Sequence, residues 1–166
     1  TPSPSPSPSP LFFDAAARPG ELLTDPGTHG PPCVHSSLPL SGLNFVVELG
    51  YVRTPVAVAA VTSKVDALVA LGCRSVRMLG SGVLDIVFVA LGRSDGCFCG
   101  VGDGDEWHSW DYAAASVILE EAGGVIENWK DEEGEGGGRQ FNLFGKSMVC
   151  ARSSKVKDAL VAMLKA

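Results

Sequence analysis

Short apolar runs alternate with longer amphipathic stretches from Leu43 to the end of the chain, and glycines or polar turns separate them. Runs rich in β-branched residues predict strands, and apolar residues at helical spacing predict helices. The resulting order is strand, helix, strand, helix, strand, helix, strand, strand, helix. The predicted strands cover 44–49, 73–79, 97–99, 125–128 and 147–151, and the predicted helices cover 55–71, 83–91, 110–122 and a last segment that starts at 153–154.

This order predicts an α/β fold with a mostly parallel sheet covered by helices. A helix between two strands lets the chain cross back, so that both strands run the same way. The second helix and the last strand are apolar nearly throughout, which is typical of a sheet covered on both faces. Thr54-Pro55 has the pattern of an N-cap and a first helical residue, and Ser109 is the predicted cap of the third helix.

The first 42 residues differ in composition from the rest. Ten of the 11 prolines lie at or before Pro39, and residues 1–10 form a Thr/Ser-Pro repeat. Because each proline fixes its own φ angle and favours extended geometry before it, this arm is predicted to be a solvated polyproline II segment. The sequence therefore predicts a disordered Ser/Pro-rich tail or linker at 1–42 and one α/β domain at 43–166.

Charge, hydropathy and cysteine content bear on which partners and which compartment are expected. The net charge is −6 and no basic run occurs, so neither nucleic acid nor a membrane surface is an expected partner. No apolar run approaches the ~20 residues that span a bilayer, and no secretory signal is visible. The five cysteines are odd in number and lack a framework spacing, which favours the cytoplasm or another reducing compartment.

Two junctions between a predicted strand and a predicted helix carry candidate chemistry. At Gly80-Ser81-Gly82 the glycines let backbone approach a ligand, and N–H groups at a helix start attract anions. The alternative is a tight turn capped by Ser81. At the second junction, Asp111 lies in the first turn of a helix, where the helix dipole alone favours an acid.

The setting of Asp111 suggests more than a dipole effect. Trp110 precedes it, and three alanines at 113–115 allow the helix to pack closely and hold the carboxylate rigidly. A rigid carboxylate that faces a cleft suits a hard cation such as Mg²⁺, which binds one or two carboxylates together with substrate phosphate oxygens.

Several separated motifs connect these junctions. They are Glu48-Leu49-Gly50 with Arg53-Thr54-Pro55, the segment from Val76 to Asp85, Val89 to Arg93 with Asp95, and Trp110-Asp111-Tyr112-Ala113-Ala114 with Glu121-Ala122-Gly123-Gly124. In order and spacing they resemble the later half of the inositol monophosphatase family, and the resemblance covers about Leu43 to Ala166. It implies the C-terminal domain of that fold.

The resemblance implies a Mg²⁺-dependent phosphomonoesterase, in which metal ions activate a water and neutralise charge on the phosphate. Asp111 matches the family's metal-ligating, substrate-facing Asp, and Gly80, Ser81 and Gly82 match the segment that contacts the sugar-like part of the substrate. The implied substrate is inositol monophosphate or a related small sugar phosphate. Relatives that cleave histidinol phosphate, galactose 1-phosphate or phosphoadenosine phosphate share these motifs, and family members are commonly homodimers.

The sequence also departs from the family pattern. The first signature, an Asp-Pro-Ile/Leu-Asp-Gly-Thr run that supplies most metal ligands, is absent, and Asp25-Pro26-Gly27-Thr28 lacks its second Asp. Cys99 stands where the family has a Glu that binds substrate hydroxyls. Asp103, Asp105 or Glu106 could replace that contact, although an acidic loop is more often merely solvated.

These departures leave the catalytic residues of the first half without a match. The hypotheses are therefore an active phosphatase, or a catalytically incomplete family module that is a fragment with impaired activity. A third hypothesis, an interaction module that uses the Ser/Thr-Pro arm, has no aromatic or basic flank to support it. Asp85 is expected to make a structural hydrogen bond, and Asp95 to belong to a turn. His108 could reach the site, but the favoured expectation is a surface histidine beside a buried Trp110.

Overall fold

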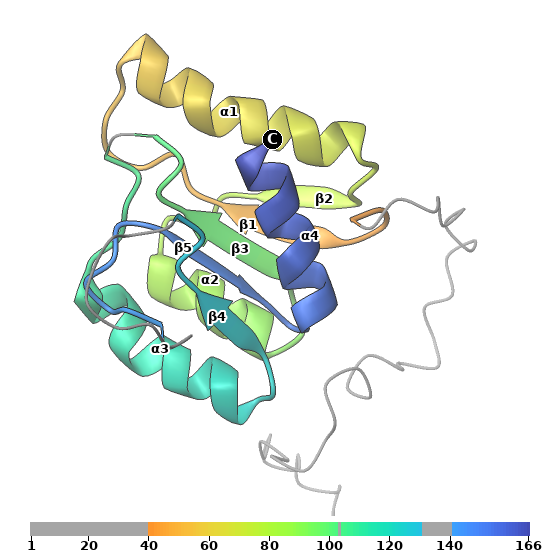
Figure 1. The fold of residues 1–166 in the computed structure, drawn as a ribbon, viewed down its shortest axis with the longest axis vertical. Coiled ribbons are helices and arrows are strands. Elements are labelled where there is room, and N and C mark those ends of the chain that lie inside the picture. The colour runs from red at the N-terminus through yellow and green to blue at the C-terminus, as the bar shows by residue number, and fades with distance from the viewer. Residues whose placement is uncertain (1–39, 103, 131–140) are drawn as a thin grey trace, which may run out of the picture.

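The computed structural model describes residues 40–102, 104–130 and 141–166 (Figure 1). Nine elements follow in the predicted order, so the α/β class and the sequence of elements are confirmed. The predicted tail falls almost wholly outside the described residues, although Leu40 is already buried in the core. The elements are β1 (Asn44–Val47), α1 (Pro55–Ala70), β2 (Ser75–Arg77), α2 (Gly82–Ala90), β3 (Gly96–Cys99), α3 (Ser109–Glu121), β4 (Val125–Glu127), β5 (Met148–Ala151) and α4 (Ser154–Lys165).

The five strands form one mixed sheet in the order β2-β1-β3-β5-β4. β1 pairs in parallel with both β2 and β3, whereas β5 is antiparallel to its neighbours β3 and β4. Four strands therefore run one way and β5 runs the other. The change of strand direction occurs between β4 and β5. Two parallel strands require a crossover connection, and the described residues between β4 and β5 include no crossover helix.

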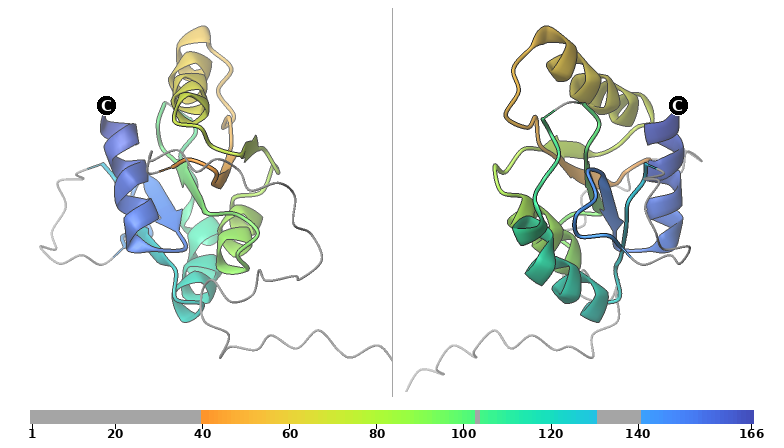
Figure 2. Two further views of the ribbon diagram at one scale, coloured as in Figure 1. Left: turned by 90° about the vertical axis from the view of Figure 1, so that its right-hand side faces the viewer. Right: turned by 60° about the vertical axis from the view of Figure 1, so that its left-hand side comes forward.

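Helices cover both faces of the sheet, α1 and α4 on one face and α2 and α3 on the other (Figures 1 and 2). Alternate residues of β1 show why, since Phe45 and Val47 pack under α1 and α4 while Val46 faces α2 and α3. The four predicted inward residues of α4 are all buried: Val156, Leu160, Met163 and Leu164. None of the helices in the described residues has the length and apolar character that crossing a bilayer requires.

Three thiols lie in the core that faces α2 and α3. Cys97 and Cys150 are opposite each other on β3 and β5, with their Sγ atoms 3.1 Å apart. Cys99 shares this face with Cys97, as the alternation of side chains along a strand predicted. Burial raises the pKa of the Cys97 thiol well above its usual value, so this thiol is neutral.

Helix starts follow the predicted capping chemistry with one exception. The Thr54 hydroxyl accepts the N–H of Ala57 at 3.2 Å, and Pro55 occupies the first helical position. The prediction that Ser109 caps α3 is wrong, because Ser109 is the first helical residue and His108 occupies the N-cap. The reason is local, since the carboxylate of Asp111 reaches back to the N–H of His108.

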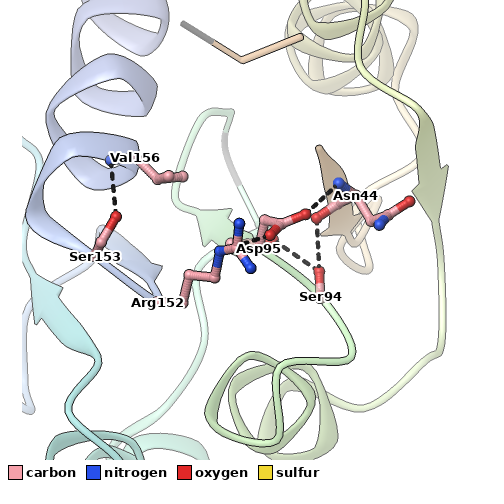
Figure 3. A network of polar contacts seen from close by, with 7 residues as sticks. Asn44, Ser94, Asp95, Arg152, Ser153 and Val156 are labelled. Atoms are coloured by element: carbon pink, nitrogen blue, oxygen red, sulfur yellow. Dashed lines mark hydrogen bonds and ion pairs between the residues drawn. The ribbon is translucent and has the colours of Figure 1, made fainter. Parts of the chain in front are cut away.

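Asp95 does more than form a turn (Figure 3). Asp95 is 6% exposed, and its Oδ2 atom accepts the N–H of Asn44 at 2.7 Å. Its Oδ1 atom lies 2.8 Å from Nε of Arg152. The same residue exchanges backbone hydrogen bonds with both partners, donating to the carbonyl of Asn44 and accepting from the N–H of Arg152. One buried carboxylate therefore joins the start of β1, the start of β3 and the end of β5.

Truncation of Leu160 to Ala is expected to lower the free energy of unfolding by about 2–5 kcal/mol, because its fully buried side chain packs between α4 and the sheet. The matched control is Leu84→Ala on α2, where the side chain is 49% exposed and the loss is expected to stay below about 1 kcal/mol. Urea denaturation followed by circular dichroism measures both. Equal losses would contradict this account of the core.

Candidate functional site

A pocket of about 390 Å³ opens at the carboxyl ends of the three parallel strands. Segments that follow β1, β2 and β3 form its walls, which is where ligands bind in open α/β sheets. The predicted glycine turn and the predicted metal carboxylate thus lie in one pocket. Its lining residues are Glu48, Gly50, Tyr51, Arg53, Gly80, Ser81, Gly82, Glu106, Trp107, His108, Trp110 and Asp111.

A carboxylate from β1 holds the glycine turn. Oε1 of Glu48 accepts the N–H of Leu79 at 2.6 Å and the N–H of Gly80 at 2.8 Å. Gly80 has a φ of +78°, a conformation that suits glycine. The Ser81 hydroxyl caps α2 by accepting the N–H of Leu84. The turn is therefore both capped and anchored, and two N–H groups that could attract an anion already bind Glu48.

Gly82 is required by a contact rather than by its backbone angles. A Cβ atom at this position would lie 2.7–3.0 Å from three ring atoms of Trp107. The indole ring consequently rests directly on the backbone at the start of α2. Trp107 thereby forms the part of the pocket wall that a side chain at position 82 would otherwise fill.

Asp111 is held by hydrogen bonding and not by packing of Trp110. Its Oδ2 atom accepts the N–H of His108 at 3.0 Å across the first turn of α3. The expectation of a buried Trp110 is wrong, because that side chain is 71% exposed. The Trp110 ring stacks on the exposed His108 ring with centroids 4.5 Å apart. Of the three alanines, Ala115 is buried, while the two before it are exposed.

Three of the candidates for the contact made by the family's hydroxyl-binding Glu lie in different surroundings, and the fourth, Asp103, lies outside the described residues. Glu106 lines the pocket and accepts the N–H of Gly104 at 2.6 Å. Asp105 is 3% exposed and lies outside the pocket lining, where its carboxylate accepts two backbone N–H groups of its own loop. Burial raises the pKa of Asp105, and those two N–H donors oppose the shift.

Cys99 also lies outside the pocket lining. It is 2% exposed on β3, and its thiol contacts the Tyr112 hydroxyl at 3.3 Å. Burial raises the pKa of Cys99 to about 12, so the thiol stays neutral. A buried neutral thiol cannot substitute for a carboxylate that binds hydroxyl groups. Of the three candidates, Glu106 is the one that reaches the pocket.

Carboxylates outnumber cations in the pocket. Glu48, Glu106 and Asp111 line it together with a single arginine, Arg53. The guanidinium of Arg53 donates to backbone carbonyls of its own segment, those of Leu49, Gly50 and Val52. This charge balance suits neutral hydroxyl groups or a cation, and it opposes the approach of an uncompensated phosphate.

The described residues do not by themselves fit a complete Mg²⁺ site. A hard cation needs several oxygen ligands that converge on one point. Within residues 40–102, 104–130 and 141–166, no group of three or more His, Cys, Asp or Glu side chains is placed to hold a metal ion. Asp111 can contribute to such a site, but no metal-dependent step can be assigned to this part of the chain alone.

Sequence reasoning assigned no role to Glu48, Tyr51, Arg53 or Trp107, all of which line the pocket. One signal could have indicated the first of these. Glu48 comes directly after a buried parallel strand, and side chains in that position face the ligand edge of the sheet. The contact between Trp107 and Gly82 has no such signal, because it joins two loops far apart in the sequence.

Fold and pocket together define an α/β module that presents a ligand site at the ends of parallel strands. The model of the inositol monophosphatase family matches residues 27–166. The chain belongs to the inositol monophosphatase family. It is 31% identical over 154 residues to an inositol monophosphatase of Mesembryanthemum crystallinum, and 37% identical over 117 residues to inositol monophosphatase 1 of Sus scrofa. These alignments cover 93% and 70% of this chain.

The chain spans about half the length of these relatives, or less, since the alignments cover 51% and 38% of them. Solved structures agree. Inositol monophosphatase from Anabaena superposes with a TM-score of 0.58 at 26% identity, and covers 76% of this chain against 45% of its own. SuhB of Mycobacterium tuberculosis gives a TM-score of 0.55 at 25% identity, with 76% and 42% covered.

A double-variant comparison tests the contact between Gly82 and Trp107. Gly82→Ala is expected to lower the free energy of unfolding by about 1–3 kcal/mol, because the new methyl group overlaps the indole ring. In a Trp107→Ala background the same change is expected to be neutral or to stabilise by up to about 1 kcal/mol, since alanine then only restricts a helical backbone. Urea denaturation of the four proteins measures the sign. An equal loss in both backgrounds would contradict the contact.

Proposed function

We propose that this chain supplies the substrate-recognition half of a phosphomonoesterase that acts on inositol monophosphate or a related small sugar phosphate. The glycine turn, Glu106 and the N-terminal end of α3 bind the polyol part of the substrate. Asp111 contributes one ligand to Mg²⁺. The remaining metal ligands come from outside the described residues, so the described part of the chain is by itself a catalytically incomplete module.

One observation supports this proposal above the others. Gly80, Ser81, Gly82 and Asp111 were singled out from two separate motifs, and they line the same pocket at the carboxyl ends of β1, β2 and β3. If the two motifs served packing alone, nothing would require them to line the same pocket. Relatives that are 31% and 37% identical to this chain are named as inositol monophosphatases.

The charge balance of the pocket supports the division into two halves. Three carboxylates and one arginine favour hydroxyl groups, which donate hydrogen bonds to carboxylate oxygens. A phosphate group carries negative charge and needs cations for its neutralisation and for attack by water. The pocket thus has what a polyol requires and lacks what a phosphate requires. A cation-binding half would supply the positive charge that the phosphate requires.

Phosphate esters with a planar ring, such as histidinol phosphate, are the second candidate substrate class. The observation in their favour is the exposed Trp110 ring at the pocket, since aromatic side chains offer a surface on which planar groups stack. That ring already stacks on His108 on one side. A comparison of the two ligand classes therefore belongs in any binding experiment.

Binding can be followed through the three tryptophans of the chain. Titration of ¹⁵N-labelled protein with inositol 1-phosphate in the presence of Mg²⁺ is expected to shift the indole N–H signals of Trp107 and Trp110. Trp129 is the internal control, because it lies outside the pocket and its N–H donates to the carbonyl of Cys99 at 2.8 Å. Histidinol phosphate serves as the competing ligand. Unchanged signals, or equal shifts of all three indoles, would contradict polyol binding in this pocket.

Turnover distinguishes an incomplete module from an active phosphatase. The isolated chain is expected to release phosphate from inositol 1-phosphate no faster than a Mg²⁺ blank, because too few metal ligands converge among the residues that the structure describes. A colorimetric phosphate assay measures this. The control is Asp111→Asn, which keeps the size and the capping oxygen of the side chain while removing its charge. Turnover that disappears in this variant would overturn the proposed incompleteness.

A further inference from the structure

A buried carboxyl group beneath the glycine turn has no role in the function proposed above. Asp85 lies in the first turn of α2 with 0% of its surface exposed. No hydrogen-bond donor among the described residues reaches either of its carboxyl oxygens. The structural hydrogen bond expected of Asp85 is therefore not one that a neighbouring donor supplies. An ionised carboxylate in this position would be buried without a donor, which is strongly unfavourable.

The nearest acidic neighbour supplies the explanation. Asp85 and Glu48 lie close enough for a hydrogen bond between their side chains. Two carboxylates cannot form one because neither carries a hydrogen, so a bond between them requires one proton. The backbone N–H groups of Leu79 and Gly80 both point at Glu48, and donors of this kind stabilise a negative charge. Glu48 accordingly keeps the charge and Asp85 keeps the proton.

We infer that Asp85 is a neutral carboxylic acid that donates a hydrogen bond to Glu48 and so fixes the carboxylate that anchors the Gly80 turn. It is a positioning residue that acts through Glu48. The chain of contacts runs from the interior of α2 through the end of β1 to the backbone of the pocket wall. The inference does not depend on which substrate the pocket binds.

The surroundings of Asp85 agree with a neutral group. Burial and the neighbouring Glu48 charge raise the pKa of Asp85 from its ordinary value to about 8. The thiol of Cys97 on β3 also faces it and is itself neutral, because burial raises its pKa. The Cys97 thiol contacts the thiol of Cys150 on β5, and Tyr112 on α3 belongs to the same cluster of buried side chains. The helix dipole favours a charge at Asp85, but it is opposed by full burial and by the charge of Glu48.

A proton held in this way makes folding depend on pH. The folded chain keeps the proton up to about pH 8, whereas an unfolded Asp releases it near its ordinary value of 3.8. Because the folded state binds more protons in this window, stability falls as pH rises from about 4 to 8. For this single group the folding equilibrium constant falls by roughly tenfold for each pH unit, and it levels off above about pH 8.

The test compares Asp85→Asn with the parent chain between pH 4 and 9. An asparagine amide has the same shape and donates to Glu48 at every pH, so the variant is expected to lose the tenfold-per-unit decline. The control is Asp66→Asn, which makes the same substitution on the exposed face of α1 and is expected to keep the decline. Urea denaturation at each pH gives the equilibrium constants. A decline in Asp85→Asn as steep as in the parent would overturn the inference.

Two further measurements remove the dependence on one variant. Carboxyl ¹³C chemical shifts of the parent chain are expected to show Asp85 protonated at pH 6.5, and an ionised Asp85 at that pH would overturn the inference without any substitution. Amide hydrogen exchange at Leu79 and Gly80 is expected to be unchanged in Asp85→Asn and several-fold faster in Asp85→Leu, which lacks a donor. Equal exchange in both variants would show that Asp85 does not position Glu48.

Discussion

The carboxylate of Asp95 sets the relative positions of the three central strands. It is bonded to the backbone N–H that begins β1 and to the guanidinium that follows β5, and its own residue leads directly into β3. Strands that are tied at one end in this way have a fixed register along their whole length. The pocket depends on that register, because its walls are the segments that leave β1, β2 and β3 at the opposite edge of the sheet.

The pocket is built by backbone geometry as much as by side chains. Glu48 uses its carboxylate on two N–H groups of the turn, Asp111 uses its own on the N–H of His108, and Trp107 rests on the bare backbone of Gly82. Each of these contacts fixes a wall, and none of them supplies positive charge. A protein that hydrolyses phosphate esters has to find that charge elsewhere. A chain that spans about half of its relatives is consistent with such a division.

The order of elements could be predicted because local chemistry decides it. Glycines end elements, and capping residues such as Thr54 begin helices. The apolar spacing of α4 identifies its buried face without any tertiary information. The two candidate junctions could be placed together for a topological reason, since parallel strands end at a common edge. β5 runs opposite to the other four strands, and the described residues between β4 and β5 contain no helix.

Features that depend on distant partners could not be predicted. Asp95 reads as a turn residue until Asn44 and Arg152 are brought beside it. Trp110 reads as a buried anchor, because tryptophan usually is one, but its ring lies on the surface against His108. Asp85 reads as an acid in need of a basic or neutral donor, and the fold places another acid beside it instead. For Asp95 and Asp85 the deciding contact spans a sequence distance over which no periodicity extends, whereas Trp110 contacts a residue only two positions away.

The positions of the cysteines allow thiol modification to report how often different parts of the sheet open. Cys97, Cys99 and Cys150 lie in the central strands with raised pKa values or complete burial, so an alkylating reagent cannot reach them while the sheet is intact. Cys73 lies half-buried beside the edge strand and is the more accessible of the cysteines in the described region. The rate at which the central thiols are modified therefore measures how often β3 and β5 separate. The rate at which Cys73 is modified measures how often the edge of the sheet beside β2 opens.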